Sequence, residues 1–282
     1  MRTGINLLLY TLHVTSEHFP IMERVRRMGY SGVEFPLNEG DAAHYRSLRR
    51  EIDNQGLACT AALVEDPAAS AISADPAARQ ASLDRLRWGI EMASILGASV
   101  LNGEFHTPPS PARAPTAGDR KRAADVYRQA AEFAGTAGLQ LAIECLNRFE
   151  SPFLSTIADG RALVKQVDHP NFRMMYDTFH AHIEEKAPGR SLREAADSII
   201  HIHISENDRG TPGSGQVRWT ETFQALKAIG YDDWLVIEAF SRNVEDMATA
   251  MRLWRDPAAN ADELCAQGLR FMNEQWAAAA AR

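Results

Sequence analysis

The chain repeats one junction five times: a helix-like segment ends at a glycine, and a short apolar run follows within a few residues. The junctions read RRMGYSGVEF, DNQGLACTAAL, SILGASVLNG, TAGLQLAIEC and KAIGYDDWLVIEAF. A glycine at the end of a helix can take the left-handed conformation that closes it, after which the chain enters a strand. Recurrence of this unit every few tens of residues predicts a repeated helix–strand architecture.

Extending from these junctions, we predict eight strands separated by helices. The strands are expected near residues 4–9, 32–35, 57–63, 99–103, 141–145, 172–176, 199–204 and 235–239. The helices are expected near 18–28, 41–55, 76–96, 119–137, 157–167, 190–197, 219–229 and 244–254, with a further one near 260–281. Eight strands in helix-separated succession are typical of the α/β class, as a (β/α)₈ TIM barrel. Because no linker or change of composition divides the chain, we expect residues 1–282 to form a single TIM-barrel domain with an extra C-terminal helix.

The charge balance and the cysteines exclude several classes of protein. With 30 Lys and Arg against 37 Asp and Glu, the net charge is −7, which disfavours a broad nucleic-acid-binding face. The apolar N-terminal stretch is too short to span a membrane and lacks a small-residue cleavage site. Cys59, Cys145 and Cys265 lie far apart without CxxC pairing, so no disulfide framework is indicated. We therefore expect a cytoplasmic protein without nucleic-acid or membrane partners.

Four acidic or imidazole side chains lie near the ends of four of the expected strands. They are Glu144 in LAIEC, Asp177 in FRMMYD, His203 in IIHIHIS and Glu238 in WLVIEAF. Asp177 follows Glu144 by 33 residues, His203 follows Asp177 by 26, and Glu238 follows His203 by 35. Each interval is about one strand–helix unit, so the four residues would occupy equivalent places at one barrel mouth. Three carboxylates and one imidazole form a hard donor set that suits Mn²⁺, Mg²⁺ or Co²⁺.

Other polar residues surround this set in the sequence. Glu150, His180 and Arg209 follow members of the set after six, three and six residues, so their side chains can converge over a metal from the loops. His201 lies two residues before His203 on the same face, and we interpret it as a buried, hydrogen-bonded core histidine rather than a ligand. The proline-rich segment 106–119 follows the fourth strand and is expected to form a wall or lid over the mouth, or else a solvated connection.

Several segments resemble one family of sugar enzymes. The runs are IECLNRFES (143–151), YDTFHAHIEE (176–185), HISENDRGTPGSG (203–215) and VIEAF (236–240), together with the tail 253–272. They closely resemble the ketose 3-epimerases, the D-tagatose/D-allulose 3-epimerase group of the xylose-isomerase-like sugar isomerase/epimerase barrels. The similarity is dense over residues 140–272 and thinner before them.

The resemblance implies an isomerase that inverts C3 of a free ketose through a cis-enediolate. Its metal ligands would be Glu144, Asp177, His203 and Glu238, and two of them, Glu144 and Glu238, would act as the acid/base pair. Glu150, His180 and Arg209 would contact the sugar near C1 to C3. The resemblance further implies one divalent ion per chain, Mn²⁺ before Co²⁺ or Mg²⁺, and a homodimer or homotetramer.

The sequence departs from the family at two places that would face the sugar. Asn6 and Leu7 stand where aromatic residues are common, and Glu104 stands where the family often has a small residue. We expect Asn6 and Glu104 to take part in substrate binding, Glu104 at the end remote from the metal. The alternative for Glu104 is an exposed lid carboxylate bonded to an arginine such as Arg113. The preferred ketose therefore stays open.

Other functions remain compatible with parts of this pattern. The same fold could serve an aldose–ketose isomerase, or an epimerase or lyase acting on keto-glycosides or inositol derivatives. An endonuclease-like barrel would need more histidine ligands and a basic groove, which the net charge of −7 disfavours. A non-catalytic sugar-binding barrel is disfavoured because both carboxylates of the acid/base pair are present.

Overall fold

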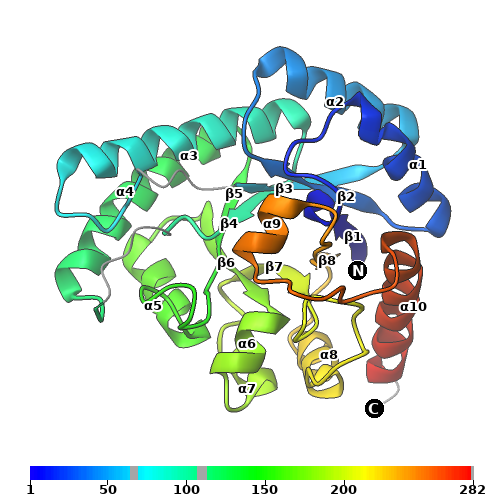
Figure 1. The fold of residues 1–282 in the computed structure, drawn as a ribbon. Coiled ribbons are helices and arrows are strands. Elements are labelled where there is room, and N and C mark those ends of the chain that lie inside the picture. Colours follow the sequence, from blue (N-terminus) through cyan, green and yellow to red (C-terminus); the bar gives the residue numbers. More distant parts are fainter. Residues whose placement is uncertain (64–68, 107–112, 281–282) are drawn as a thin grey trace.

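The computed structural model describes residues 1–63, 69–106 and 113–280, in which eight parallel strands close into a barrel in sequence order (Figure 1). The strands are β1 (Arg2–Asn6), β2 (Gly32–Leu37), β3 (Ala58–Leu63), β4 (Val100–Gly103), β5 (Gln140–Ile143), β6 (Phe172–Asp177), β7 (Ile199–Ile204) and β8 (Trp234–Ile237). Closure occurs between β1 and β8, where Ile5 pairs with Ile237. The predicted (β/α)₈ fold is confirmed.

Helices surround the strands largely in the predicted alternation, except that two helices, α6 and α7, stand between β6 and β7 where one was predicted. They are α1 (Phe19–Met28), α2 (Ala42–Gln55), α3 (Pro76–Leu96), α4 (Ala117–Thr136), α5 (Ile157–Val167), α6 (Thr178–Glu184), α7 (Pro188–Glu194), α8 (Trp219–Ala228), α9 (Glu245–Ala250) and α10 (Ala261–Ala280). The extra C-terminal helix, α10, contacts α8 and α1 on the outside of the barrel (Figure 1). Among the described helices, none has the length and apolar character needed to cross a membrane.

The junction glycines act as the sequence predicts. Gly29, Gly56 and Gly97 end α1, α2 and α3 with φ values of 102°, 64° and 79°. Gly138 and Gly230 follow α4 and α8 by two residues and are also left-handed, with φ values of 70° and 68°. In this region a residue with a Cβ is strained, so glycine ends each helix at low cost.

The first strand is shorter than predicted. The apolar residues 4–9 were expected to form one strand, but β1 ends at Asn6 and a 3₁₀-helix, η1 (Leu7–Leu9), follows. The Asn6 side chain accepts a hydrogen bond from the backbone N–H of Leu8 at 2.9 Å, which caps this turn. The three leucines are buried in either conformation, so their hydrophobicity alone did not distinguish a strand from a turn.

Two strand ends set the position of the site. β5 ends at Ile143 and β8 ends at Ile237, so Glu144 and Glu238 are the first residues beyond the carboxyl ends of their strands.

Of the proline-rich segment predicted to form a lid, residues 107–112 lie outside the described residues. The short helix α9 lies across the mouth of the barrel in Figure 1. Three of its residues, Asp246, Met247 and Ala250, line the cavity there.

Candidate metal and sugar site

The structure brings together the four residues that the sequence proposes as metal ligands. Glu144, Asp177, His203 and Glu238 are buried, and each offers a donor atom that lies within 4.8 Å of the others. Asp177 is the last residue of β6 and His203 lies near the end of β7, so all four donors come from the carboxyl ends of strands. This is the end of a TIM barrel where active sites form.

The donor set fits one divalent cation. In the described part of the chain, Glu144 Oε1 and His203 Nδ1 are buried without a hydrogen-bond partner. Nδ1 lies 3.4 Å from Glu238 Oε1 and 3.7 Å from Asp177 Oδ2. Burial, with the charges of Glu238 and Asp177, raises the pKa of Glu144 well above its ordinary value. A cation bound among these atoms would relieve that repulsion and give both atoms a partner.

Carboxylates lie on both sides of the His203 ring: Glu34 near Nε2, and Glu238 and Asp177 near Nδ1. Burial lowers its pKa, but Glu238 and then Glu34 outweigh burial and raise the pKa of His203 well above its ordinary value. A positive charge is therefore favoured at this point in the cluster. A divalent cation bound to Nδ1 would supply the positive charge that the second proton of an imidazolium otherwise supplies.

Arg209 links two of these carboxylates. Its Nη1 donates to Glu238 Oε2 at 2.7 Å and to Asp177 Oδ2 at 3.1 Å. The guanidinium lies over the Phe179 ring at 3.8 Å and near the Phe240 ring at 5.1 Å. The backbone of Arg209 is left-handed, with φ of 62°, a conformation that costs a non-glycine residue about 1–3 kcal/mol. Such strain is typical of functional sites where the surrounding structure imposes it.

The loop that carries Arg209 is organised by Glu206, which the sequence analysis did not single out. Glu206 is fully buried. Its carboxylate accepts hydrogen bonds from the backbone N–H groups of Asn207, Gly213 and Val217 and from Trp219 Nε1. Because these partners lie between one and thirteen residues away, the loop folds around the carboxylate and fixes the position of Arg209. The available signal was one of two acidic residues, Glu206 and Asp208, at the start of a loop rich in glycine.

His180 presents a neutral N–H group to the cavity. It lies in the first turn of α6, and its Nδ1 accepts a hydrogen bond from the backbone N–H of Asn147 at 3.0 Å. Burial lowers the pKa of His180 to about 3, although Asp177 opposes the shift. Because Nδ1 accepts from Asn147, the single ring proton is on Nε2, which lies 3.2 Å from Arg209 Nη2 and 3.5 Å from Glu144 Oε1. A neutral donor at this place suits a substrate oxygen.

The site opens into a cavity of about 370 Å³ at the mouth of the barrel. Glu144, His203 and Glu238 line it, together with all three residues that the resemblance assigns to the sugar: Glu150, His180 and Arg209. Glu104 also lines the cavity and is half-buried. Leucine and methionine side chains form much of the remaining wall: Leu8, Leu12, Leu63, Met247 and Met251. The volume is that of a site for a small molecule.

Asn6 is fully buried and is not among the described residues that line the cavity. Its amide donates to Glu34 Oε1 at 2.9 Å and to Glu238 Oε1 at 3.4 Å. From the segment that follows β1, the described residues that line the cavity are Leu8 and Leu12. A role for Asn6 in direct substrate binding stays a prediction, and its contacts are with other protein groups.

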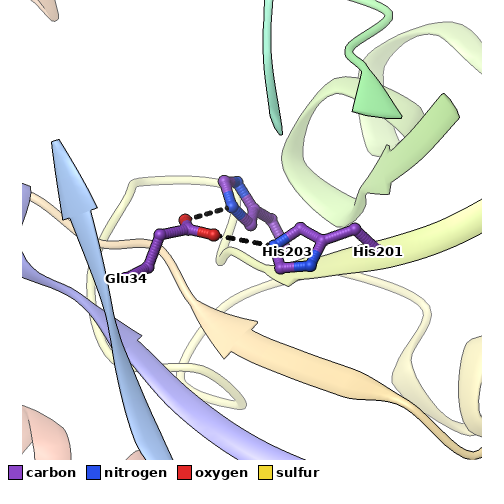
Figure 2. Close-up of side chains that lie close together, drawn as sticks. All are labelled: Glu34, His201 and His203. Atoms are coloured by element: carbon purple, nitrogen blue, oxygen red, sulfur yellow. Dashed lines mark hydrogen bonds and ion pairs between the residues drawn. The ribbon is translucent and has the colours of Figure 1, made fainter. Parts of the chain in front are cut away.

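Glu34 is a buried carboxylate that sequence reasoning missed. It lies on β2 with both oxygens facing imidazoles: Oε1 is 2.7 Å from His203 Nε2 and Oε2 is 2.8 Å from His201 Nε2 (Figure 2). Burial alone would raise the pKa of Glu34, but His203 and His201 hold it well below its ordinary value. His201 is fully buried, as predicted, but neither of its ring nitrogens has a hydrogen-bond partner, so the predicted hydrogen-bonded state is wrong. The signal for Glu34 was one charged residue inside the apolar strand GVEFPL.

A closed (β/α)₈ barrel with an acidic, histidine-containing cavity at the carboxyl ends of its strands defines a TIM-barrel enzyme. Residues 22–275 match the xylose isomerase-like TIM barrel family, and the chain belongs to that family.

Individual relatives are sugar 3-epimerases. The D-psicose 3-epimerase of Agrobacterium fabrum is 30% identical over 268 residues, which cover 93% of each chain. The ketose 3-epimerase of Arthrobacter globiformis is 28% identical over 279 residues, 98% of this chain and 96% of that one. A solved structure of an L-ribulose 3-epimerase matches with a TM-score of 0.93 at 29% identity, over 99% of this chain and 95% of that one. The resemblance to ketose 3-epimerases and the assignment to the isomerase class are confirmed.

Proposed function

We propose that this protein is a divalent-metal-dependent epimerase that inverts C3 of a free ketose. The observation that carries the proposal is that donor atoms of Glu144, Asp177, His203 and Glu238 lie within 4.8 Å of one another, and that three of these residues, Glu144, His203 and Glu238, line the cavity. The relationship to sugar 3-epimerases along nearly the whole chain supports the same reaction.

The reaction requires two groups that exchange protons with one carbon. Inversion removes the C3 proton next to the C2 carbonyl and returns a proton to the opposite face, through a cis-enediolate. Glu144 and Glu238 extend from β5 and β8, which are not neighbours in the barrel, so a sugar bound between them would meet one carboxylate on each face. A bound divalent cation would polarise the carbonyl and stabilise the negative charge that develops on oxygen.

Other residues of the chain would bind and orient the sugar. His180 and Arg209 both line the cavity, where the neutral Nε2–H and the guanidinium would offer hydrogen-bond donors to the oxygens on which charge develops. Glu150 is kept at the cavity rim by a hydrogen bond from Asn147 Nδ2 at 2.7 Å, where it would accept from a terminal hydroxyl. Glu104 would contact the distal hydroxyls.

The proposal includes the remaining expectations from the sequence. Residues 1–282 would act as one barrel domain, with Mn²⁺ as the first candidate for the bound ion and Co²⁺ or Mg²⁺ as alternatives. The protein would work in the cytoplasm as a homodimer or homotetramer, on a small-molecule ketose.

The test is product analysis in deuterated water. Protein loaded with Mn²⁺ is incubated with single ketopentoses and ketohexoses, and the products and their labelled positions are identified by NMR. We expect a C3-epimeric ketose with deuterium at C3. An aldose product with deuterium at C1 or C2 would contradict the proposal and favour the aldose–ketose isomerase. Protein treated with a chelator and re-supplied with Mn²⁺ serves as the matched control.

A further inference from the structure

Glu34 is the centre of a hydrogen-bond network that joins five strands inside the barrel. It is 0% exposed and reaches from β2 to β7, from which β1 and β8 separate it in the strand order. Its oxygens accept hydrogen bonds from four residues: Asn6 Nδ2 (2.9 Å), Thr60 Oγ1 (2.8 Å), Asn102 Nδ2 (2.5 Å) and His203 Nε2 (2.7 Å). His201 Nε2 lies 2.8 Å from Oε2 without hydrogen-bond geometry. These residues come from β1, β3, β4 and β7.

This network determines which ring nitrogen of His203 would bind a metal ion. A carboxylate only accepts hydrogen bonds, so the Nε2 atom of His203 carries a proton directed at Glu34. The other ring nitrogen, Nδ1, then faces Glu238 and Asp177, at 3.4 Å and 3.7 Å. Figure 2 shows the Glu34 carboxylate facing both imidazoles, with a dashed line from each oxygen to one of the rings.

Glu34 also reaches a second member of the donor set. The Asn6 amide that donates to Glu34 Oε1 at 2.9 Å lies 3.4 Å from Glu238 Oε1. The orientation of this amide is set by its own oxygen, which accepts from the backbone of Leu8. Glu34 therefore touches His203 directly and Glu238 through one side chain.

We propose that Glu34 is a positioning residue for the metal site. It holds His203 with Nδ1 toward the cation, places a negative charge behind the imidazole, and, through Asn6, restrains Glu238. The inference rests on the proposed metal dependence. Groups that bond to the outer face of a metal-binding histidine typically change metal affinity by about 10- to 100-fold when they are replaced.

The alternative arrangement is that Glu34, His201 and His203 bind a second cation. Glu34, His201 and His203 also offer donor atoms within 4.8 Å of one another. However, Asn6, Thr60 and Asn102 already donate to the same carboxylate, and His203 Nε2 makes a hydrogen bond to it at 2.7 Å. The hydrogen-bonded arrangement is therefore the one we propose.

The test is the Mn²⁺ affinity of Glu34→Gln. The amide has nearly the size of the carboxylate, but whichever way it turns, its N–H groups face a donor, and the negative charge behind His203 is lost. We expect the dissociation constant for Mn²⁺, measured by chelator competition at constant pH, to rise about 10- to 100-fold in folded protein. An unchanged constant would overturn the proposal.

Thr60→Val is the matched control. It removes one donor to Glu34 Oε2, the oxygen remote from His203, and touches none of the four metal-donor residues. We expect a lower free energy of unfolding with the Mn²⁺ affinity unchanged. If Thr60→Val weakened Mn²⁺ binding as much as Glu34→Gln, the effect would reflect general loosening of the barrel, and the specific role of Glu34 would be refuted.

Two measurements on the wild-type protein stay informative even if Glu34→Gln fails to fold. In ¹⁵N NMR of the histidine side chains, we expect the protected His203 Nε2–H signal both before and after Mg²⁺ is added, because Glu34 holds it independently of the metal. A signal that appears only with Mg²⁺ would overturn the proposal, as would two Mn²⁺ ions per chain with the second lost in His201→Gln. If wild-type protein binds no cation, the proposed function itself is refuted. If wild type and Glu34→Gln bind Mn²⁺ equally well, only the role of Glu34 is refuted.

Discussion

One nitrogen of Arg209 bridges two carboxylates of the proposed metal site: Nη1 donates to Glu238 Oε2 at 2.7 Å and to Asp177 Oδ2 at 3.1 Å. The planar guanidinium can make both bonds while its ring-facing surface packs on Phe179. A lysine ammonium cannot reproduce this stacked, forked geometry. Arg209 therefore connects carboxylate orientation to the part of the cavity that would receive the sugar.

We expect Arg209→Lys to lower kcat/KM by roughly 10- to 150-fold, which corresponds to about 1.5–3 kcal/mol for hydrogen bonds to a charged group. The decrease should be similar for all ketoses that are accepted, because the contact lies near the reacting carbons. Steady-state kinetics with several ketoses measures it. Arg161→Lys, which alters a surface pair with Asp197, is the matched control and should leave kcat/KM unchanged. Wild-type kinetics in Arg209→Lys would exclude this role.

Replacing either of the two proposed acid/base carboxylates should block proton transfer on one face of C3 and leave it on the other. We expect Glu144→Gln and Glu238→Gln each to lower the epimerisation rate by about 10²- to 10⁴-fold, because each substitution removes a proton-transfer group. A variant that retains metal should still exchange the C3 proton of one epimer with solvent, because the remaining carboxylate works on that face. NMR of each C3 epimer in deuterated water measures the exchange. If both variants hold metal and epimerise at near wild-type rates, the pair is assigned wrongly.

Metal binding should also stabilise the folded protein. Four buried donors, three of them carboxylates, repel one another without a cation, and Mn²⁺ at 100 times its dissociation constant adds about 2.7 kcal/mol to the free energy of unfolding. Thermal unfolding with and without Mn²⁺ should show a higher midpoint with the ion. In Asp177→Asn the increase should be smaller or absent. An identical increase in that variant would mean that Mn²⁺ binds elsewhere.

The barrel and the proposed ligands were predictable because their signals are local. Glycines that end helices and apolar runs of strand length repeat along the chain, and Glu144 and Glu238 interrupt or end such runs. The end of the first strand was predicted wrongly, because a single side-chain hydrogen bond from Leu8 to Asn6 decides it. Helix α6 was not predicted, and its first turn is capped by the Asp177 carboxylate, which accepts from the backbone of Phe179.

The network around Glu34 was not predictable from the same patterns. Its contact with His203 joins residues 169 positions apart, and its other partners lie on strands that give no sequence sign of their common neighbour. Only closure of the barrel places them around one carboxylate. The roles of the site residues, in contrast, remain predictions that the proposed variants test.

Substrate choice should depend on Glu104, which lines the cavity just beyond β4. We expect Glu104→Ala to reorder the ketoses by kcat/KM, with changes of about 1–3 kcal/mol, or roughly 5- to 150-fold, for those whose distal hydroxyls donate to this carboxylate. Mn²⁺ affinity should stay the same. Kinetics on a series of ketopentoses and ketohexoses measures the effect. A uniform change, or none, would favour the alternative of a structural carboxylate. The arginine considered for that alternative, Arg113, pairs with Asp119.

Asp119 holds the first turn of α4, the helix that follows β4. It forms a capping box with Thr116 and accepts hydrogen bonds from Arg113 and Arg122. The Arg113 guanidinium, with help from Thr116, holds the pKa of this buried carboxyl well below its ordinary value, although burial opposes the shift. The ionised form is therefore the one that stabilises the fold.

A group whose pKa is lower in the folded than in the unfolded chain adds stability above its unfolded value, about 3.9 for Asp, and loses it as the pH falls toward the folded value. We expect Asp119→Asn to lower the free energy of unfolding by about 0.5–2 kcal/mol at neutral pH, as loss of a helix cap does. The difference from wild type should shrink below about pH 4. Urea unfolding across this range measures it, with Asp125→Asn on the exposed side of the same helix as control. A difference that stays constant with pH would show that the charge of Asp119 contributes nothing.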